Sequence, residues 1–301
     1  MDELKEIITE DGTISLRSIF YDENFHSQMG ALYEAKNKFI DPSLINRFEK
    51  KSLNVLDICF GLGYNSALLF KKILSQSSTL LWYGLEIDRR PLRYALKNKL
   101  FRDLWDHEIV GILNSILNDG IYSHKNIQCN LLWGDARSKI ESIPEDINFD
   151  LIFLDGFSPQ KCPEIWTFEF LEKVKRKLKP KGNLITYSSS AAVRKTLIDL
   201  NLKIFNIKPN NETNKYWSNG TLAISNSNKS ECIENPYIED LSFMQIEHLS
   251  TKSSIPYRDP NGKNLSKDIL KRRIKEQSIS KLKATNLWRK KWKMTKSAFN
   301  G

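Results

Sequence analysis

Two apolar runs that each end at a polar turn constrain the fold of this chain most. Residues 149–154 are mostly apolar and lead directly into Asp155 and a glycine. Upstream, residues 54–58 lead into the glycine-rich segment 60–65. Strands of a buried parallel sheet are continuous apolar runs, and their carboxyl ends meet at one edge of the sheet. The sequence therefore predicts a crevice with a glycine-rich turn on one side and an acidic residue on the other.

The rest of the body alternates strand-like and helix-like patterns. Apolar runs predict strands over residues 80–86, 127–133, 151–154 and 183–187. Helical spacing of apolar residues predicts helices over residues 65–74, 91–99, 105–117, 163–178 and 191–200. This alternation predicts an α/β fold with a doubly wound, mostly parallel sheet. Residues 203–207 and 221–224 are joined by a loop rather than a helix, which predicts an antiparallel hairpin at one edge.

The two ends of the chain differ from this body. Residues 12–40 contain short β-leaning segments, which predict a small N-terminal β-rich layer in which 31–35 is a strand or a short helix. Toward the C-terminus, residues 268–282 have the character of a basic helix. We therefore expect three units, with boundaries at residues 1–50 for the N-terminal layer, 51–230 for the main domain and 231–301 for a basic C-terminal extension.

The positive charge of the chain is concentrated in its tail. The net charge is +10, and the last 50 residues, 252–301, hold 15 Lys and Arg against 3 Asp and Glu. The remaining residues hold 31 basic and 33 acidic side chains and are close to neutral. A basic segment this concentrated indicates a polyanionic partner, with nucleic acid first; the alternative is a solvated tail without a partner. Trp288 and Trp292 lie among these cations, where they either stack on bases or dock on the body.

Several classes of protein do not fit this sequence. Apolar runs stay well short of the roughly 20 residues that cross a bilayer, and the acidic N-terminus is unlike a signal peptide, so we expect a cytoplasmic protein with no membrane partner. The four cysteines are widely separated and form no C-x-x-C pair, so we expect neither a metal site nor a disulfide framework; they are Cys59, Cys129, Cys162 and Cys232.

The glycine-rich turn favours a particular kind of cofactor. It reads Gly61-x-Gly63-x-Asn65, in which two glycines permit a tight turn and a close backbone approach. The third glycine of the dinucleotide fingerprint, which lets a pyrophosphate reach the helix N-terminus, is missing. A ligand without a pyrophosphate is therefore favoured, and S-adenosylmethionine fits. The alternative is a turn with a purely structural role.

Two further acids follow predicted strands at the same edge. Glu86 ends the second strand, 25 residues after Gly61, where a carboxylate can accept hydrogen bonds from both ribose hydroxyls. Asp88 is a rival for that role, and an exposed strand-end acid is the alternative. Asp135, followed by Ala136, ends the third strand, where a carboxylate can meet an adenine amino group; the alternative there is a helix N-cap.

Asp155 is the candidate catalytic residue. Methyl transfer to nitrogen needs a neutral amine whose lone pair faces the methyl group, and a carboxylate can hold that amine and take up its proton. The Gly and Pro after Asp155 predict a tight loop, in which Phe157 walls the amine pocket. The alternative role for Asp155 is to cap the loop before the helix that starts at Pro163. Trp166 either lines the pocket or packs in the core.

At these residues the chain resembles a known family, the methyltransferase domain of the tRNA 5-methylaminomethyl-2-thiouridine biosynthesis protein MnmC. The resemblance covers residues 13–200 and rests on the segments 60–65, 133–135, 153–166 and 187–195, with a further likeness over 21–34. It implies a Rossmann-like class I methyltransferase fold that uses S-adenosyl-L-methionine. It also implies tRNA as the partner, with methyl transfer to the aminomethyl nitrogen of a modified wobble uridine.

The resemblance also assigns roles to individual residues. It gives Asp155 the catalytic place. The cofactor places fall on Asp57, Phe60, Gly61, Gly63, Asn65, Glu86, Asp135 and Ala136. The substrate places fall on Phe157, Pro159, Lys161, Trp166, Arg194 and Lys195.

Two departures from the family qualify the resemblance. The chain has no room for the flavin-dependent oxidase domain of the bifunctional form, so we expect a stand-alone methyltransferase. The loop 210–220 lacks the basic character expected there, which leaves the basic tail to grip the tRNA. Two other functions stay open: a polyamine aminopropyltransferase, which needs an acidic amine pocket and no basic tail, and a non-catalytic RNA-binding protein on a methyltransferase fold.

Overall fold

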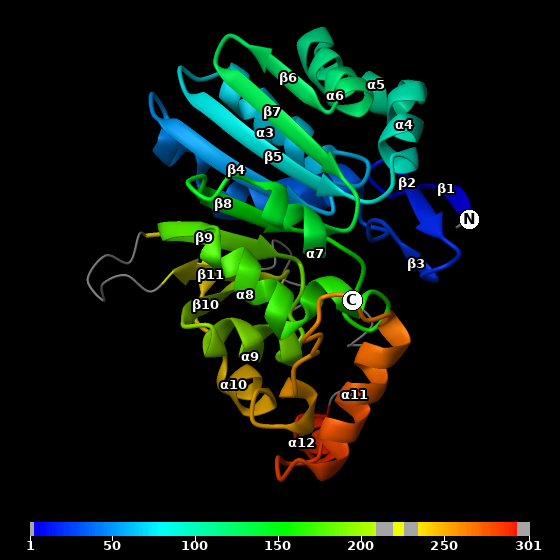
Figure 1. Ribbon diagram of the computed structural model, residues 1–301, viewed down its shortest axis with the longest axis vertical. Coiled ribbons are helices and arrows are strands. Elements are labelled where there is room, and N and C mark those ends of the chain that lie inside the picture. Colours follow the sequence, from blue (N-terminus) through cyan, green and yellow to red (C-terminus); the bar gives the residue numbers. More distant parts are fainter. Residues whose placement is uncertain (1–2, 209–218, 226–233, 294–301) are drawn as a thin grey trace.

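A computed structural model describes residues 3–208, 219–225 and 234–293 (Figure 1). Most of the loop 210–220 and Cys232 lie outside the described residues. Within them, a nine-stranded sheet has the order β12-β10-β11-β9-β8-β4-β5-β7-β6. Its strands are β4 (Ser52–Ile58), β5 (Thr79–Glu86), β6 (Ile121–His124), β7 (Ile127–Trp133), β8 (Phe149–Leu154), β9 (Leu178–Thr186), β10 (Leu202–Ile207), β11 (Thr221–Ser225) and β12 (Ile238–Glu239).

The centre of the sheet is parallel and its edges are antiparallel. Strands β9, β8, β4, β5 and β7 run parallel, and β6, β10, β11 and β12 pair antiparallel with their neighbours. The predicted doubly wound, mostly parallel sheet is confirmed. The predicted hairpin, β10 with β11, is also present, but β12 rather than the hairpin forms the edge.

Helices cover both faces of the sheet, which explains why most residues of its central strands are buried. Successive side chains of a strand point to opposite faces, and Val55 and Leu56 belong to two separate core clusters accordingly. The first cluster packs under α3 (Tyr64–Leu74), α4 (Arg90–Lys97), α5 (Lys99–Arg102) and α6 (His107–Asp119). The second packs under α7 (Ala136–Lys139), α8 (Phe168–Arg176) and α9 (Ala191–Asp199).

The predicted helix over residues 163–178 is wrong in part. Pro163–Trp166 forms a single 3₁₀ turn, and α8 begins only at Phe168 after Thr167, whose side chain caps the helix. The helix ends at Arg176, and Leu178 already belongs to β9. Trp166 therefore lies outside the helix with which its spacing matched.

The N-terminal residues form a small layer beside the main sheet. Strands β1 (Leu4–Ile8), β2 (Ile14–Ser18) and β3 (Glu23–Asn24) make a separate antiparallel sheet. The chain then turns helical through α1 (Ala31–Glu34), a π-helical turn at Ala35–Ile40 and α2 (Asp41–Ser43). The segment 31–35, expected as a strand or a short helix, is thus helical. Figure 1 shows this layer at the side of the main sheet, near the ends of β4 and β5.

The basic tail is folded against the body. Figure 1 shows α10 (Phe243–His248), α11 (Ser266–Ile279) and α12 (Thr285–Lys291) gathered beyond α8 and α9. Tyr257, Ile269 and Trp288 of this tail are buried. Trp288 stacks on His248 with ring centroids 4.1 Å apart, and its Nε1 donates to the Met244 carbonyl at 3.0 Å. Base stacking by Trp288 is therefore excluded, and docking on the body is its role.

Candidate active site

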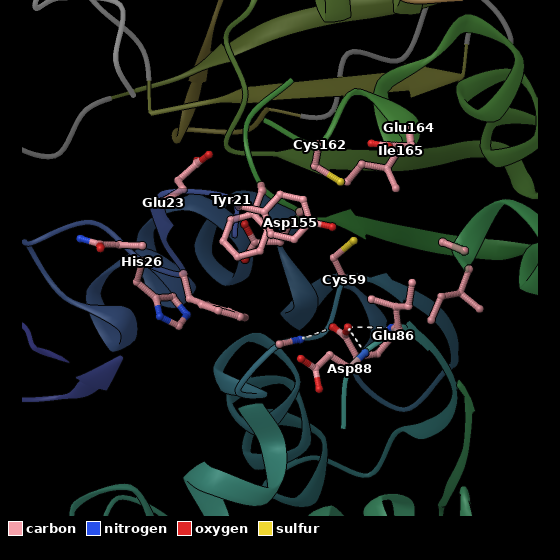
Figure 2. Close-up of a pocket in the computed structure, with 18 of the residues that line it drawn as sticks. Tyr21, Glu23, His26, Cys59, Glu86, Asp88, Asp155, Cys162, Glu164 and Ile165 are labelled. Atoms are coloured by element: carbon pink, nitrogen blue, oxygen red, sulfur yellow. Dashed lines mark hydrogen bonds between the residues drawn. The ribbon is translucent and has the colours of Figure 1, made fainter. Parts of the chain in front are cut away.

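The site lies where the order of the strands reverses. Strand β4 has β5 on one side and β8 on the other, and ligands of open α/β sheets bind at the carboxyl ends of strands at such a switch point. The Asp155 amide donates to the Ile58 carbonyl at 3.0 Å, which holds the two strand ends side by side. A cavity of about 860 Å³ opens there. Figure 2 shows Asp155 and Glu86 on either side of Cys59 in its wall.

Glu86 holds the glycine-rich turn at the cavity. Its Oε2 accepts a hydrogen bond from the Gly61 amide at 2.8 Å, and its Oε1 accepts from the amides of Ile87 and Asp88 at 2.7 and 2.9 Å (Figure 2). Burial raises the pKa of Glu86, and these backbone donors oppose that effect. Gly61 has φ 59°, where a side chain is strained, and its backbone lines the cavity. Gly61 and Glu86 therefore form a polar cradle for a ligand.

Asp135 combines two roles that the sequence presented as alternatives. It caps α7 by accepting from the Arg137 amide at 2.9 Å, and it also lines the cavity together with Ala136. The Arg137 Nη2 donates to Asp135 Oδ2 at 2.7 Å, and its Nη1 donates to Asp259 Oδ2 at 2.7 Å. Burial opposes ionisation of Asp135, but the hydrogen bonds and charge of Arg137 lower its pKa overall.

Asp155 is a half-buried carboxylate held from one side. Its Oδ2 accepts from the Asn65 Nδ2 at 2.8 Å. Burial, followed by the nearby charge of Glu34, raises the pKa of Asp155 to about 7, against the effect of the Asn65 hydrogen bond. A carboxyl with such a pKa exchanges a proton readily near neutral pH. Asp155 thus has the properties of a general base.

The N-terminal layer supplies the wall opposite the sheet. Tyr21, Glu23, Phe25, His26 and Glu34 all line the cavity. Glu23 accepts from the Ser158 amide at 3.1 Å and from the Ser158 Oγ at 2.7 Å, which ties the layer to the loop after Asp155. The resemblance over residues 21–34 assigns no site residues to this segment. The density of aromatic residues between 20 and 26 is the signal that could have revealed them.

Known proteins with similar sequences and structures agree with this geometry. A sequence model described as S-adenosyl-L-methionine-dependent methyltransferase matches residues 102–215. The crystal structure of MNMC2 from Aquifex aeolicus superposes with a TM-score of 0.77 at 26% identity, covering 92% of this chain and 86% of that one. The fold and these matches show that the chain carries an S-adenosyl-L-methionine-dependent methyltransferase domain. Its fold is the Rossmann-like fold that the sequence predicted.

Two curated relatives extend the likeness. The uncharacterized protein MJ0670 of Methanocaldococcus jannaschii is 36% identical over 212 residues, which are 65% of this chain and 55% of that protein. The bifunctional protein MnmC of Campylobacter hominis, named for tRNA 5-methylaminomethyl-2-thiouridine biosynthesis, is 26% identical over 191 residues. That match covers 60% of this chain and 28% of the relative. The methyltransferase therefore spans about half the length of these relatives or less.

The predicted cofactor residues divide into two groups. Gly61, Glu86, Asp135 and Ala136 line the cavity. Four others support the wall instead: Asp57, Phe60, Gly63 and Asn65. A Cβ on Gly63 would lie 2.9 Å from the Phe60 ring, so these two shape the turn. Asp57 is fully buried, accepts from Ser66 Oγ at 2.6 Å and has a pKa raised to about 7 by burial.

Most of the predicted substrate residues lie away from the cavity. Phe157 lines it, whereas Pro159 is buried and Lys161 pairs with Asp22 of the N-terminal layer at 3.3 Å. Trp166 as a substrate residue is wrong, because it is fully buried and its Nε1 donates to the Phe157 carbonyl at 2.8 Å. It supports the wall from behind.

Arg194 and Lys195 of α9, the other two predicted substrate residues, do not line the cavity. Arg194 is buried, and it donates to Thr221 Oγ1 at 2.9 Å and Asn206 Oδ1 at 2.8 Å. It therefore joins α9 to the antiparallel strands β10 and β11. Lys195 forms an ion pair with Asp199 on the outside of the same helix.

The described residues show neither a metal centre nor a membrane span. No group of three or more His, Cys, Asp or Glu side chains is arranged there to hold a metal ion. No helix in the same part of the chain is long and apolar enough to cross a bilayer.

Proposed function

We propose that this methyltransferase N-methylates the aminomethyl group of a modified wobble uridine in tRNA. The observation that carries the proposal is Asp155, a carboxyl with a pKa of about 7 in a cavity that the cofactor turn and the aromatic N-terminal layer share. The names of the MnmC and MNMC2 relatives support tRNA as the substrate class. A tRNA substrate also implies a cytoplasmic location.

The residues at the strand ends fit the cofactor. Gly61 offers an open backbone at the cavity, and Glu86 and Asp135 offer carboxylate oxygens for the ribose hydroxyls and the adenine amino group. When bound, the cofactor supplies a methyl group on a sulfonium sulfur, whose S–C bond breaks with its electron pair left on sulfur as the acceptor nitrogen forms the new N–C bond.

Asp155 handles the proton of the acceptor amine. An ammonium group has no lone pair, so the acceptor must be neutral to react. The Asp155 carboxylate holds the amine by a hydrogen bond and takes up one N–H proton, while Asn65 fixes the orientation of its Oδ2. Glu23 and Glu34 add negative potential to the same wall, which attracts a cationic amine into the cavity.

The tail supplies the charge for a polyanion. Arg272 and Arg273 are engaged with the backbone of the tail, through the carbonyls of Arg258 and Ile255. A set of lysines remains exposed on and around α11: Lys263, Lys267, Lys271, Lys275, Lys281 and Lys283. Ammonium groups that neutralise phosphates provide sequence-independent affinity for nucleic acid.

The decisive experiment measures transfer of label from radiolabelled S-adenosylmethionine to tRNA from cells that lack the final methylation step. Nucleoside analysis of the product should find the label in methylaminomethyluridine, and Asp155→Asn should slow its appearance by about 10² to 10⁴. Cofactor binding without labelled tRNA would overturn the proposal. In that case the acidic cavity would point to a small amine as the acceptor, including the polyamines of the aminopropyltransferase alternative.

A further inference from the structure

A row of aromatic rings in contact with one another runs from the surface into the cavity. Phe20 is 73% exposed, and its ring meets the Tyr21 ring edge to face with centroids 4.9 Å apart. The Tyr21 ring stacks on the Phe157 ring with centroids 4.6 Å apart. The Phe25 ring meets the Phe157 ring edge to face with centroids 4.9 Å apart. All four residues line the cavity that contains Asp155.

Folding alone does not account for Phe20. Most of the Phe20 side chain stays exposed to water, so its burial contributes little to the stability of the layer. The backbone nevertheless holds it in place, because the Tyr21 amide donates to Ser18 Oγ at 3.0 Å and Asp22 is paired with both Arg17 and Lys161. The chain thus fixes an exposed aromatic ring at the rim of the cavity.

The surroundings of this rim match a nucleic acid. Arg17 and Arg90 also line the cavity, and each keeps a partly exposed guanidinium although it pairs with an aspartate. The wall thus presents the exposed Phe20 ring and two partly exposed, aspartate-paired arginines at the rim, and the half-buried Asp155 carboxyl inside. A base with its phosphates outside and its amine inside has the complementary order.

We propose that Phe20 and Tyr21 form a stacking site for the target nucleobase after it leaves the stack of the RNA loop. The inference rests on the proposed function and adds how the substrate enters. A base that is unstacked loses contacts with its neighbours, and aromatic side chains replace them. In this arrangement the Phe20 ring receives the base at the rim, and Tyr21 together with Phe157 guides its amine-bearing side toward Asp155.

The test compares Phe20→Ala with Ile121→Ala. Ile121 is a matched control because it is 63% exposed on β6, an edge strand of the main sheet that belongs neither to the cavity nor to the tail. Phe20→Ala should lower kcat/KM for hypomodified tRNA by about tenfold to a hundredfold, the range that stacking on one aromatic side chain gives. Phe20→Trp should retain most of the activity, and the cofactor Kd should stay at the wild-type value in all three variants.

A second readout follows the base itself. An anticodon stem-loop with 2-aminopurine beside the wobble position should brighten when the wild-type enzyme binds, because the neighbouring base leaves the stack. Phe20→Ala should reduce this increase at saturating protein. Wild-type enzyme that fails to methylate tRNA would overturn the proposed function. Wild-type enzyme that methylates tRNA, together with a Phe20→Ala variant indistinguishable from Ile121→Ala, would overturn the stacking site alone.

Discussion

The N-terminal layer and the C-terminal tail both lie outside the parallel sheet, yet they reach the active site in different ways. The layer places side chains such as Tyr21 and Glu23 directly in the cavity wall. The tail acts through an intermediary, because its Asp259 is fully buried and pairs with Arg137, which in turn holds Asp135. We therefore expect the layer to affect the acceptor directly, and the tail to affect the cofactor edge through Arg137 in addition to binding RNA through its lysines.

The connection of the tail to the body is built from several contacts over residues 257–266, called the strap below. The Phe168 amide donates to the Tyr257 carbonyl at 2.9 Å, and Arg258 pairs with Glu169 at 2.8 Å. The Arg137 Nη1 also donates to the Asn264 carbonyl at 2.9 Å. The strap therefore links the basic helix α11 to two residues of the cavity wall, Arg137 and Asp135.

The largest effect is expected where the two regions converge, at Asp155. Asp155→Asn keeps the shape of the side chain but cannot accept a proton, so methyl transfer should fall by about 10² to 10⁴. Single-turnover kinetics at saturating tRNA measure this loss, and calorimetry should find the cofactor Kd within about twofold of wild type.

In the wild type, kcat should fall as the pH drops below about 7, because the carboxyl whose pKa is raised to that value becomes protonated. A kcat independent of pH between 5.5 and 7.5 would contradict the role.

The strap gives the next largest effect. Asp259→Asn removes the charge that holds Arg137 from the tail side, so Asp135 should lose its fixed position. We expect the Kd for S-adenosylhomocysteine to rise about tenfold, the size of one lost charge-assisted hydrogen bond. The preference for S-adenosylhomocysteine over S-inosylhomocysteine, which lacks the adenine amino group, should shrink as well.

Glu169→Gln is the matched control for the strap. It alters the acceptor of Arg258 Nε and of the Asp259 amide but leaves the side-chain pair of Arg137 and Asp259 in place, so it should keep the preference for adenine. If Asp259→Asn and Glu169→Gln each weaken the binding of S-adenosylhomocysteine and of S-inosylhomocysteine by the same factor, the strap acts only on the stability of the fold.

The layer should give the opposite split of kinetic effects. Glu23→Gln replaces an acceptor of two hydrogen bonds from Ser158 and loosens the layer from the loop after Asp155. The KM for tRNA should rise about fivefold, in line with the loss of about one net hydrogen bond, while the cofactor Kd is unchanged. Glu6→Gln on the exposed face of β1 is the control. A change in cofactor affinity in Glu23→Gln would break the division between layer and tail.

The smallest effect concerns a single lysine of the tail. Lys271→Ala should reduce the slope of log K against log salt for tRNA binding by about one, as expected for one phosphate contact. Lys71→Ala on α3 changes the net charge equally and should leave the slope as it is in the wild type. Point variants are preferable to removal of residues 252–301. That removal would delete the buried side chains of Tyr257, Ile269 and Trp288 and so expose the core against which they pack.

The sequence predicted the parts of the molecule that local patterns encode. The strand over 127–133 matches β7 because its alternate residues Ile127, Cys129 and Leu131 are apolar and buried, and Asp155 is found from sequence because it follows the apolar strand β8. Trp166 was misplaced because its spacing fits a helix that starts two residues later. Asp259 was missed because its burial depends on Arg137, 122 positions away, and no local pattern records such a pair.

The strap has a consequence for the order in which the chain becomes functional. Isolated helices of about 14 residues are marginal in water, and α11 has that length and buries only Ile269. The strap that leads into α11 contacts Thr167, Glu169 and Arg137, and these contacts exist only after the central sheet has formed. A nascent or partly unfolded chain would thus lack an ordered array of lysines. We therefore expect high affinity for RNA only in a molecule whose catalytic cavity has already formed.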